Sequence, residues 1–152
     1  MNQKKLSKTN IFVLIVGIIA VFFVIAAILF KWQYPASSDF GTSGKFQEEE
    51  VKAEATEIVE LFSAQEYEQI MTEYAGKVLL DDAEAEDLKY AATTVNPDWG
   101  EFQKINTITL GELKRAGKQY ALAEVETAYE NVTVTFTFSF DENMKLSGVY
   151  MK

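Results

Sequence analysis

The sequence predicts an α+β protein in which three helices pack on a curved four-stranded antiparallel sheet, with one transmembrane helix before them. Three observations support this fold class. An uncharged apolar run fills residues 11–30, apolar residues then recur at helical spacing as far as Val95, and the rest of the chain alternates with the period of a β-strand.

The N-terminal third indicates a membrane protein. Twenty apolar residues in a helix cover about 30 Å, the thickness of a hydrocarbon core. Lysines precede the run, which favours a cytoplasmic N-terminus. We therefore expect a basic N-terminus over residues 1–10, a transmembrane helix over 11–30, a flexible linker over 31–45 and an extracytoplasmic domain over 46–152.

A cleaved signal peptide is the alternative interpretation of this segment. Ala36 and Ser38 offer a small-x-small cleavage pattern, and cleavage would give a secreted form. The apolar region of a signal peptide is usually about 7–15 residues, shorter than this one. The favoured expectation is a chain held in the cell membrane through Ile11 to Phe30, with its C-terminal domain outside the cytoplasm.

Three helices are predicted from apolar residues spaced three or four positions apart. Their expected buried residues are Val51, Ala55, Ile58, Val59 and Phe62 in the first, Tyr67, Ile70, Met71 and Tyr74 in the second, and Ala85, Leu88, Ala92 and Val95 in the third. Ser63 with Glu66, and Asp81 with Glu84, form capping patterns before the second and third helices.

Four strands are predicted after the helices, over residues 105–113, 120–130, 132–140 and 145–151, which are rich in Thr, Val, Phe and Tyr. The clearest of them is "VTVTFTFSF". Its Val and Phe residues point to one face and its Thr and Ser residues to the other, because side chains alternate along a strand. We expect the Val and Phe face to lie in the core.

The composition excludes several function classes. The chain has no cysteine and no histidine, so it can form neither a Ser-His-Asp nor a Cys-His catalytic arrangement. No cofactor and no metal site are predicted. All 23 acidic residues follow the apolar run, whereas four of the 14 basic residues precede or end it. So acidic a domain would be repelled by phosphates, and no nucleic-acid partner is expected.

The chain from residue 46 to 152 resembles the cone-shaped nuclear transport factor 2-like superfamily, and in particular bacterial extracytoplasmic domains of unknown function. The resemblance lies in the helix-helix-helix-strand order, in "WGEFQKI" and in "FDENMKLSGVYM". It implies a cone-like fold. Some members of the superfamily are enzymes that project an Asp or His into the cone, whereas others are binding modules or anchored parts of cell-envelope assemblies.

Two candidate sites follow from the predicted elements. The small residues Ala121 and Ala123 face the phenylalanines and could leave a cleft, unless the phenylalanine side chains fill it. The side chains expected around such an apolar pocket are Tyr67, Tyr74, Tyr90, Trp99, Tyr129 and Phe136. Tyr120 and Leu122, on the other face of their strand, are candidates for a protein contact.

The stretch "VNPDWGEFQKI" is interpreted as a structural corner. Pro97 cannot continue a helix, and Gly100 permits a reversal of the chain into the following strand. Trp99 and Phe102 are expected to fix the corner by packing, while Asp98 and Glu101 point to water.

These observations favour a non-enzymatic binding or assembly module at the cell envelope. Its partner would be an envelope protein or a small apolar ligand. The alternative is a small-molecule-binding domain, or an enzyme domain that uses a carboxylate as acid or base. Every inward position of the clearest strand is apolar, and no inward ionisable group is evident, so we do not expect an enzyme.

Overall fold

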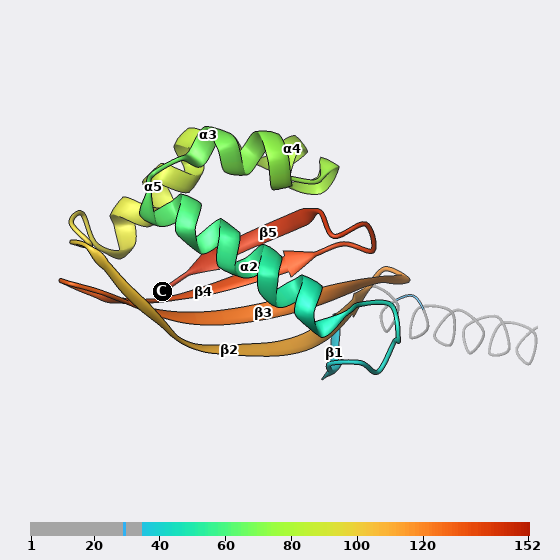
Figure 1. Ribbon diagram of the computed structural model, residues 1–152. Helices are drawn as coiled ribbons and strands as arrows, with labels where there is room; N and C mark the ends of the chain where they lie inside the picture. The colour runs from blue at the N-terminus through green and yellow to red at the C-terminus, as the bar shows by residue number, and fades with distance from the viewer. Residues whose placement is uncertain (1–28, 30–34) are drawn as a thin grey trace, which may run out of the picture. The chain divides into compact units, whose positions relative to one another are not determined.

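A computed structural model of the protein describes residue 29 and residues 35–152. Residues Ala36–Lys152 form one compact unit, in which the helices cover one face of an antiparallel sheet and leave the other face uncovered (Figure 1). One face of the sheet is therefore buried against the helices, and the other is open to solvent.

The sheet has five strands, ordered as they occur in the chain: β1 (Ala36–Asp39), β2 (Phe102–Arg115), β3 (Lys118–Tyr129), β4 (Thr133–Phe140) and β5 (Leu146–Met151). Every neighbouring pair is antiparallel. β1 and β5 are therefore the two edges of the sheet.

Four α-helices and a short π-helical segment pack on the covered face (Figure 1). They are α2 (Glu48–Ser63), α3 (Tyr67–Gln69), the π segment η1 (Ile70–Tyr74), α4 (Lys77–Asp82) and α5 (Ala85–Val95). Glu84 is the N-cap residue of α5, and its backbone N–H donates to the Asp87 side chain at 2.8 Å, as in a capping box.

The predicted fold class is wrong in its element count. The sheet has five strands where four were expected, because Ala36–Asp39, inside the predicted linker, pairs with β2. Residues 35–152 contain four α-helices where three were expected. α4 was missed because it has six residues and buries only Leu79, so it carries no periodic signal.

The predicted capping signals were only partly right. Ser63 does not begin the second helix but ends α2, where its hydroxyl donates to the Val59 carbonyl. Asp81 lies within α4 and forms an ion pair with Lys77. Neither Ser63 nor Asp81 caps the helix that was predicted to follow it. The N-cap residue of α5 is Glu84.

The predicted transmembrane helix is not part of the fold as described. Within residue 29 and residues 35–152, no helix is both long and apolar enough to cross a membrane. Apart from Leu29, the segment 11–30 lies outside the described residues. The fold class is therefore corrected to an α+β domain with four helices on one face of a five-stranded antiparallel sheet.

The core confirms the face assignment of β4. Val134, Phe136, Phe138 and Phe140 are all completely buried. The rings of Phe136 and Phe138 stack with centroids 5.4 Å apart, and Phe62 of α2 lies 5.2 Å from Phe136. Aromatic rings thus fill the space above the equally buried Ala121 and Ala123, and any cavity has to lie elsewhere.

The first edge strand is fixed by a buried carboxylate. Glu112 lies on the covered face of β2, opposite Ala121, and is completely buried. Its two oxygens accept hydrogen bonds from the backbone N–H groups of Gly41 and Ser43, at 3.0 and 2.9 Å. These bonds hold the loop between β1 and α2 against the sheet, because a buried carboxylate is stable only when it is paired or hydrogen-bonded.

Candidate ligand cavity

A cavity of about 350 Å³ opens at one end of the sheet, where the chain turns from α5 into β2. Its walls come from the end of α2, from α3 and α5, from the corner between α5 and β2, and from the end of β3. The lining residues are Phe62, Ser63, Gln65, Tyr67, Lys89, Ala92, Thr93, Asn96, Pro97, Asp98, Trp99, Gly100, Glu101, Tyr129 and Glu130.

The corner is built by local hydrogen bonds that follow from its sequence. α5 ends at Val95, and the Asn96 side chain accepts a bond from the Asp98 N–H. Asp98 in turn accepts a bond from the Gly100 N–H at 3.0 Å. Both are the short-range side-chain turns that Asn and Asp favour. The corner residues shape one wall of the cavity.

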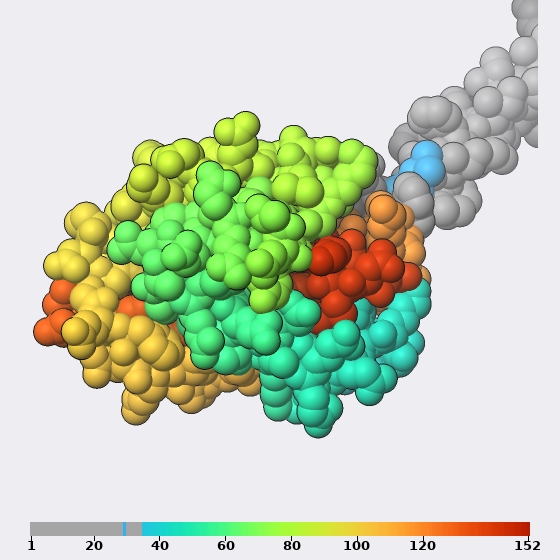
Figure 2. All heavy atoms as spheres, turned by 45° about the horizontal axis from the view of Figure 1, so that its top comes forward, coloured from blue at the N-terminus to red at the C-terminus, as the bar shows by residue number. Residues whose placement is uncertain are grey.

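The corner is also joined to the turn between β3 and β4. The N–H groups of Glu130 and Asn131 donate to the carbonyls of Glu101 and Trp99. Gly100 has a φ of +70°, and a Cβ at this position would lie 2.6 Å from the Cβ of Glu130, so no other residue fits without displacement. Figure 2 shows the corner and this turn side by side at one end of the domain.

Aromatic rings form the floor of the cavity. The Trp99 ring lies 4.8 Å from Tyr129 and 5.8 Å from Phe136, and its indole N–H donates to the Ala92 carbonyl at 3.2 Å. Phe102 packs on the outer side of Tyr129 at 5.6 Å. Trp99 therefore fixes the corner, as expected, and at the same time presents part of its ring to the cavity.

Two hydroxyl groups meet at the inner end of the cavity. The Ser63 and Tyr129 hydroxyl oxygens lie 2.8 Å apart. Ser63 has one hydroxyl hydrogen, which it donates to the Val59 carbonyl, so Tyr129 is the donor between the two. Burial raises the pKa of Tyr129 above its usual value. The phenol therefore stays protonated at neutral pH.

Gln65 lies at the cavity wall in a backbone conformation that usually belongs to glycine. α2 ends with bonds from the Gln65 N–H to the Phe62 carbonyl and from the Glu66 N–H to the Leu61 carbonyl. This is the Schellman arrangement, in which the residue after the helix takes a positive φ. Gln65 has a φ of +60°, so a polar side chain lies at the cavity where a glycine would be less strained.

The structure brings three of the six predicted pocket residues together around the cavity, namely Tyr67, Trp99 and Tyr129. Phe136 lies beneath them in contact with Trp99. Tyr74 lies elsewhere, where its hydroxyl donates to Glu57 at 2.8 Å. This hydrogen bond raises the pKa of Tyr74 from 10.0 to about 12.

Tyr90 belongs to a different surface. It is 74% exposed and borders an open groove between α5 and β5, together with Val149 and Tyr150. Helical spacing predicted the buried residues Ala85, Leu88 and Ala92 of α5 correctly, and Tyr90 lies outside that face. Its assignment to the pocket was therefore inconsistent with the spacing of its own helix.

Tyr120 and Leu122 lie on the uncovered face of the sheet, half-buried by their neighbours. Tyr120 is opposite Leu113 of β2, and Leu122 is opposite Gly111 and Ser139. Their role as a protein contact stays a prediction. Their strand neighbours Glu124 and Glu126 share this face, as expected.

One inward ionisable group was missed by the sequence reasoning. Glu112 is buried on the covered face, although no such group was evident from the pattern of the clearest strand. The sequence could have indicated this position, because Glu112 is two residues after Leu110 in "TLGEL" and alternate residues of a strand share a face. Glu112 is not among the residues that line the cavity.

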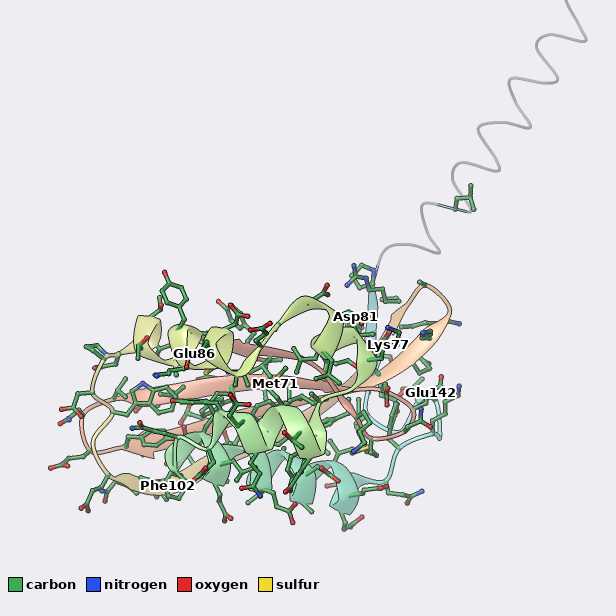
Figure 3. The ribbon with its side chains drawn as sticks, turned by 90° about the horizontal axis from the view of Figure 1, so that it is seen from above. Met71, Lys77, Asp81, Glu86, Phe102 and Glu142 are labelled. Carbon is green, nitrogen blue, oxygen red and sulfur yellow. The ribbon has the colours of Figure 1, made fainter. Side chains whose placement is uncertain are left out.

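The cavity and the β1 edge lie at opposite ends of the domain. Phe102 marks the cavity end, and Glu142, which is paired with Lys45 of the loop after β1, marks the other (Figure 3). Two hydrogen bonds, from the Lys45 side chain and the Gln119 backbone, hold the pKa of Glu142 below its usual value. The ion pair of Lys45 and Glu142 therefore lies at the end of the domain away from the cavity.

The architecture defines a class: a small α+β domain with helices on one face of an antiparallel sheet and a cavity where the last helix meets the sheet. Residues 55–149 match the protein family of unknown function DUF3887, and the chain belongs to that family. A similar fold occurs in the NMR structure of a protein from Ruminococcus gnavus, with a TM-score of 0.64 and 21% identity over 76% of this chain and 99% of that one. No curated protein matches the chain.

Proposed function

We propose that this domain is a non-enzymatic binding module and that the cavity beside the corner is its ligand site. The observation that carries the proposal is the cavity of about 350 Å³ with Tyr67, Trp99 and Tyr129 in its walls. Small-molecule sites are typically concave, lined by aromatic side chains and equipped with a few polar groups, and have volumes of roughly 300–1,000 Å³.

The conformation of Gln65 supports a ligand site at this position. Non-glycine residues with a positive φ are uncommon, and strained residues cluster at binding sites. A glycine would satisfy the helix end at lower conformational cost. The amide side chain that stands there instead reaches the cavity, where it can hydrogen-bond a ligand.

Binding is favoured over catalysis by the state of the carboxylates. A catalytic acid or base needs a dry environment that moves its pKa toward neutrality. At the cavity, Asp98, Glu101 and Glu130 are all exposed to solvent. The buried Glu112 uses both of its oxygens to hold backbone N–H groups, which leaves its role structural.

We further propose that the domain acts on the outer side of the cell membrane. The support for this is the uncharged segment 11–30 with lysines before it, which directs the following chain outward whether or not it is cleaved. Protease added to intact cells should then degrade the domain. Full protection of the domain in intact cells, with digestion only after lysis, would refute this location.

A screen of small organic compounds against the full-length chain tests the ligand site. Backbone amide shifts in the NMR spectrum should move together for residues 62–67 and 92–101. Gln65→Gly should weaken these responses and leave the fold intact, since glycine accepts a φ of +60°. Tyr150→Ala, in the groove at β5, is the matched control and should bind like the parent chain. Shifts confined to the β5 groove, or no shifts at all, would refute the cavity as the site.

A second candidate function is assembly through the uncovered face of the sheet. The observation in its favour is the contiguous group Leu113, Tyr120 and Leu122. The group lies on the face of the sheet that α2 to α5 leave uncovered (Figure 1). The acidic Glu124 and Glu126 lie beside the group, so its partner would carry basic residues around an apolar centre. Leu122→Glu should abolish cross-linking to such a partner without affecting ligands of the cavity.

A further inference from the structure

We propose that the cavity selects an organic cation, a molecule that carries a protonated amino or guanidinium group on an apolar body. The inference rests on the proposed ligand site and adds the chemical class of its ligand. Three independent properties of the cavity point the same way: the charge of its rim, the hydrogen-bonding state of its inner end and the aromatic character of its floor.

The rim of the cavity is predominantly acidic. It carries the carboxylates of Asp98, Glu101 and Glu130, against one cationic side chain, that of Lys89. The Lys89 ammonium already has the Glu86 carboxylate 3.6 Å away. The field at the mouth of the cavity is therefore negative, which attracts a cation and repels an anion.

The Glu130 carboxylate lies close to the corner. One of its oxygens is 3.1 Å from the position that a Cβ on Gly100 would take. This places the negative charge beside the residue that follows Trp99. A cation on the Trp99 ring would thus lie close to a carboxylate.

The hydroxyl pair of Ser63 and Tyr129 at the inner end of the cavity has no free hydrogen. Tyr129 donates its hydrogen to Ser63, and Ser63 donates its own to the Val59 carbonyl. What the two oxygens can still offer a ligand is lone pairs. A ligand group that bonds to this pair is therefore a hydrogen-bond donor, as ammonium and guanidinium groups are.

The floor of the cavity is built from aromatic rings at an angle to each other. The Trp99 and Tyr129 rings are 4.8 Å apart with an interplanar angle of 60°. A cation over the face of a tryptophan or tyrosine ring is attracted by the quadrupole of the ring. The apolar body of the ligand can pack on the same rings.

A metal ion fits the cavity less well than an organic cation. Metal sites need several ligand atoms converging on one point. Within the part of the chain that the structure describes, no three His, Cys, Asp or Glu side chains gather in this way. The acidic side chains here are dispersed around a rim, which suits a larger cation that carries its own apolar surface.

Three probes of similar size and different charge test the inference: benzylammonium, benzyl alcohol and benzoate. Trp32→Phe in the full-length chain leaves Trp99 as the single tryptophan, so its fluorescence reports on the cavity. Benzylammonium should change the Trp99 emission saturably and bind about tenfold more tightly than benzyl alcohol, the effect of one favourable cationic contact. Benzoate should bind most weakly, and added salt should weaken benzylammonium binding alone.

A pair of charge-neutralising variants locates the effect. Glu130→Gln, at the rim, should weaken benzylammonium binding severalfold and leave benzyl alcohol binding unchanged. Glu124→Gln removes the same charge from the uncovered face of the sheet and should change neither. Circular dichroism verifies that both variants are folded.

The outcomes separate this inference from the binding function on which it rests. If benzyl alcohol or benzoate binds as tightly as benzylammonium and changes Trp99 emission, the cavity is a ligand site but the cationic class is wrong. Equal losses in Glu130→Gln and Glu124→Gln would also overturn the class, since the effect would then come from net charge. If none of the three probes changes Trp99 emission, both proposals fail.

Discussion

The hydroxyl oxygens of Ser63 and Tyr129 lie 2.8 Å apart and connect the last turn of α2 to the end of β3. They come from residues 66 positions apart, so this bond forms only when the helix is seated on the sheet. It closes the inner end of the cavity and holds the Tyr129 ring against Trp99.

Tyr129→Phe removes this hydrogen bond and keeps the ring. We expect the free energy of unfolding to fall by about 1 kcal/mol, the usual net value of one buried hydrogen bond. Urea denaturation measures the change. When Tyr129→Phe is made in the Ser63→Ala variant, the free energy of unfolding should fall by clearly less, because the hydrogen-bond partner of Tyr129 is already absent. Equal costs in the two backgrounds would mean that the bond contributes nothing.

Trp99→Ala removes the ring that holds the corner against Tyr129 and Phe136. The free energy of unfolding should fall by about 3 kcal/mol, as for the loss of a large packed aromatic side chain. Asp98→Asn combined with Glu101→Gln should change it by less than about 0.5 kcal/mol, since both side chains are exposed and Asn keeps the oxygen that bonds the Gly100 N–H. A stable Trp99→Ala chain would show that the corner does not depend on Trp99.

Phe138→Asp and Thr137→Asp place the same charge on opposite faces of β4. Phe138 is completely buried among aromatic rings, so an unpaired carboxylate there should cost several kcal/mol and unfold the domain. Thr137 faces the uncovered side, next to Tyr150, and its substitution should be tolerated. The two melting temperatures measure the difference, and equal losses would contradict the assigned faces.

Glu112→Ala removes both acceptors that hold the loop between β1 and α2. We expect a loss of about 2–3 kcal/mol, since bonds to a buried carboxylate are among the stronger ones in proteins. Hydrogen exchange at the Gly41 and Ser43 amides should accelerate by more than exchange in β4. Glu124→Ala, on the uncovered face, is the control and should leave both exchange rates unchanged. Slow exchange at Gly41 in Glu112→Ala would contradict the role of the carboxylate.

The pKa of Tyr74 should fall from about 12 toward 10.0 in Glu57→Ala, because the hydrogen bond to Glu57 is the largest cause of its elevation. Carbon NMR of labelled tyrosine rings, followed against pH, measures this shift. The folded pKa is raised, so its stabilising contribution is present below pH 10.0 and is lost as the pH rises toward about 12. An unchanged titration in Glu57→Ala would remove Glu57 as the cause.

The sequence by itself determined the elements that carry a periodic signal. The alternation in "VTVTFTFSF" placed Phe136 and Phe138 in the core, because side chains along a strand alternate between its faces. Pro97 and Gly100 located the corner through backbone restrictions that act within a few residues. Local sequence patterns of this kind also predicted that Trp99 lies at the corner and Tyr129 near the end of its strand.

Tertiary structure alone decided the features that depend on residues far apart in the chain. Ala36–Asp39 becomes a strand because β2 offers it an edge and Glu112 holds the loop that follows, and neither partner is visible in four small or polar residues. Helical spacing could not show that Tyr74 lies away from the cavity, because spacing defines a face but not what packs against it. The cavity gathers α2, α3, α5 and the end of β3, and the physical reason it escaped prediction is that long-range packing, not local periodicity, brings these segments together.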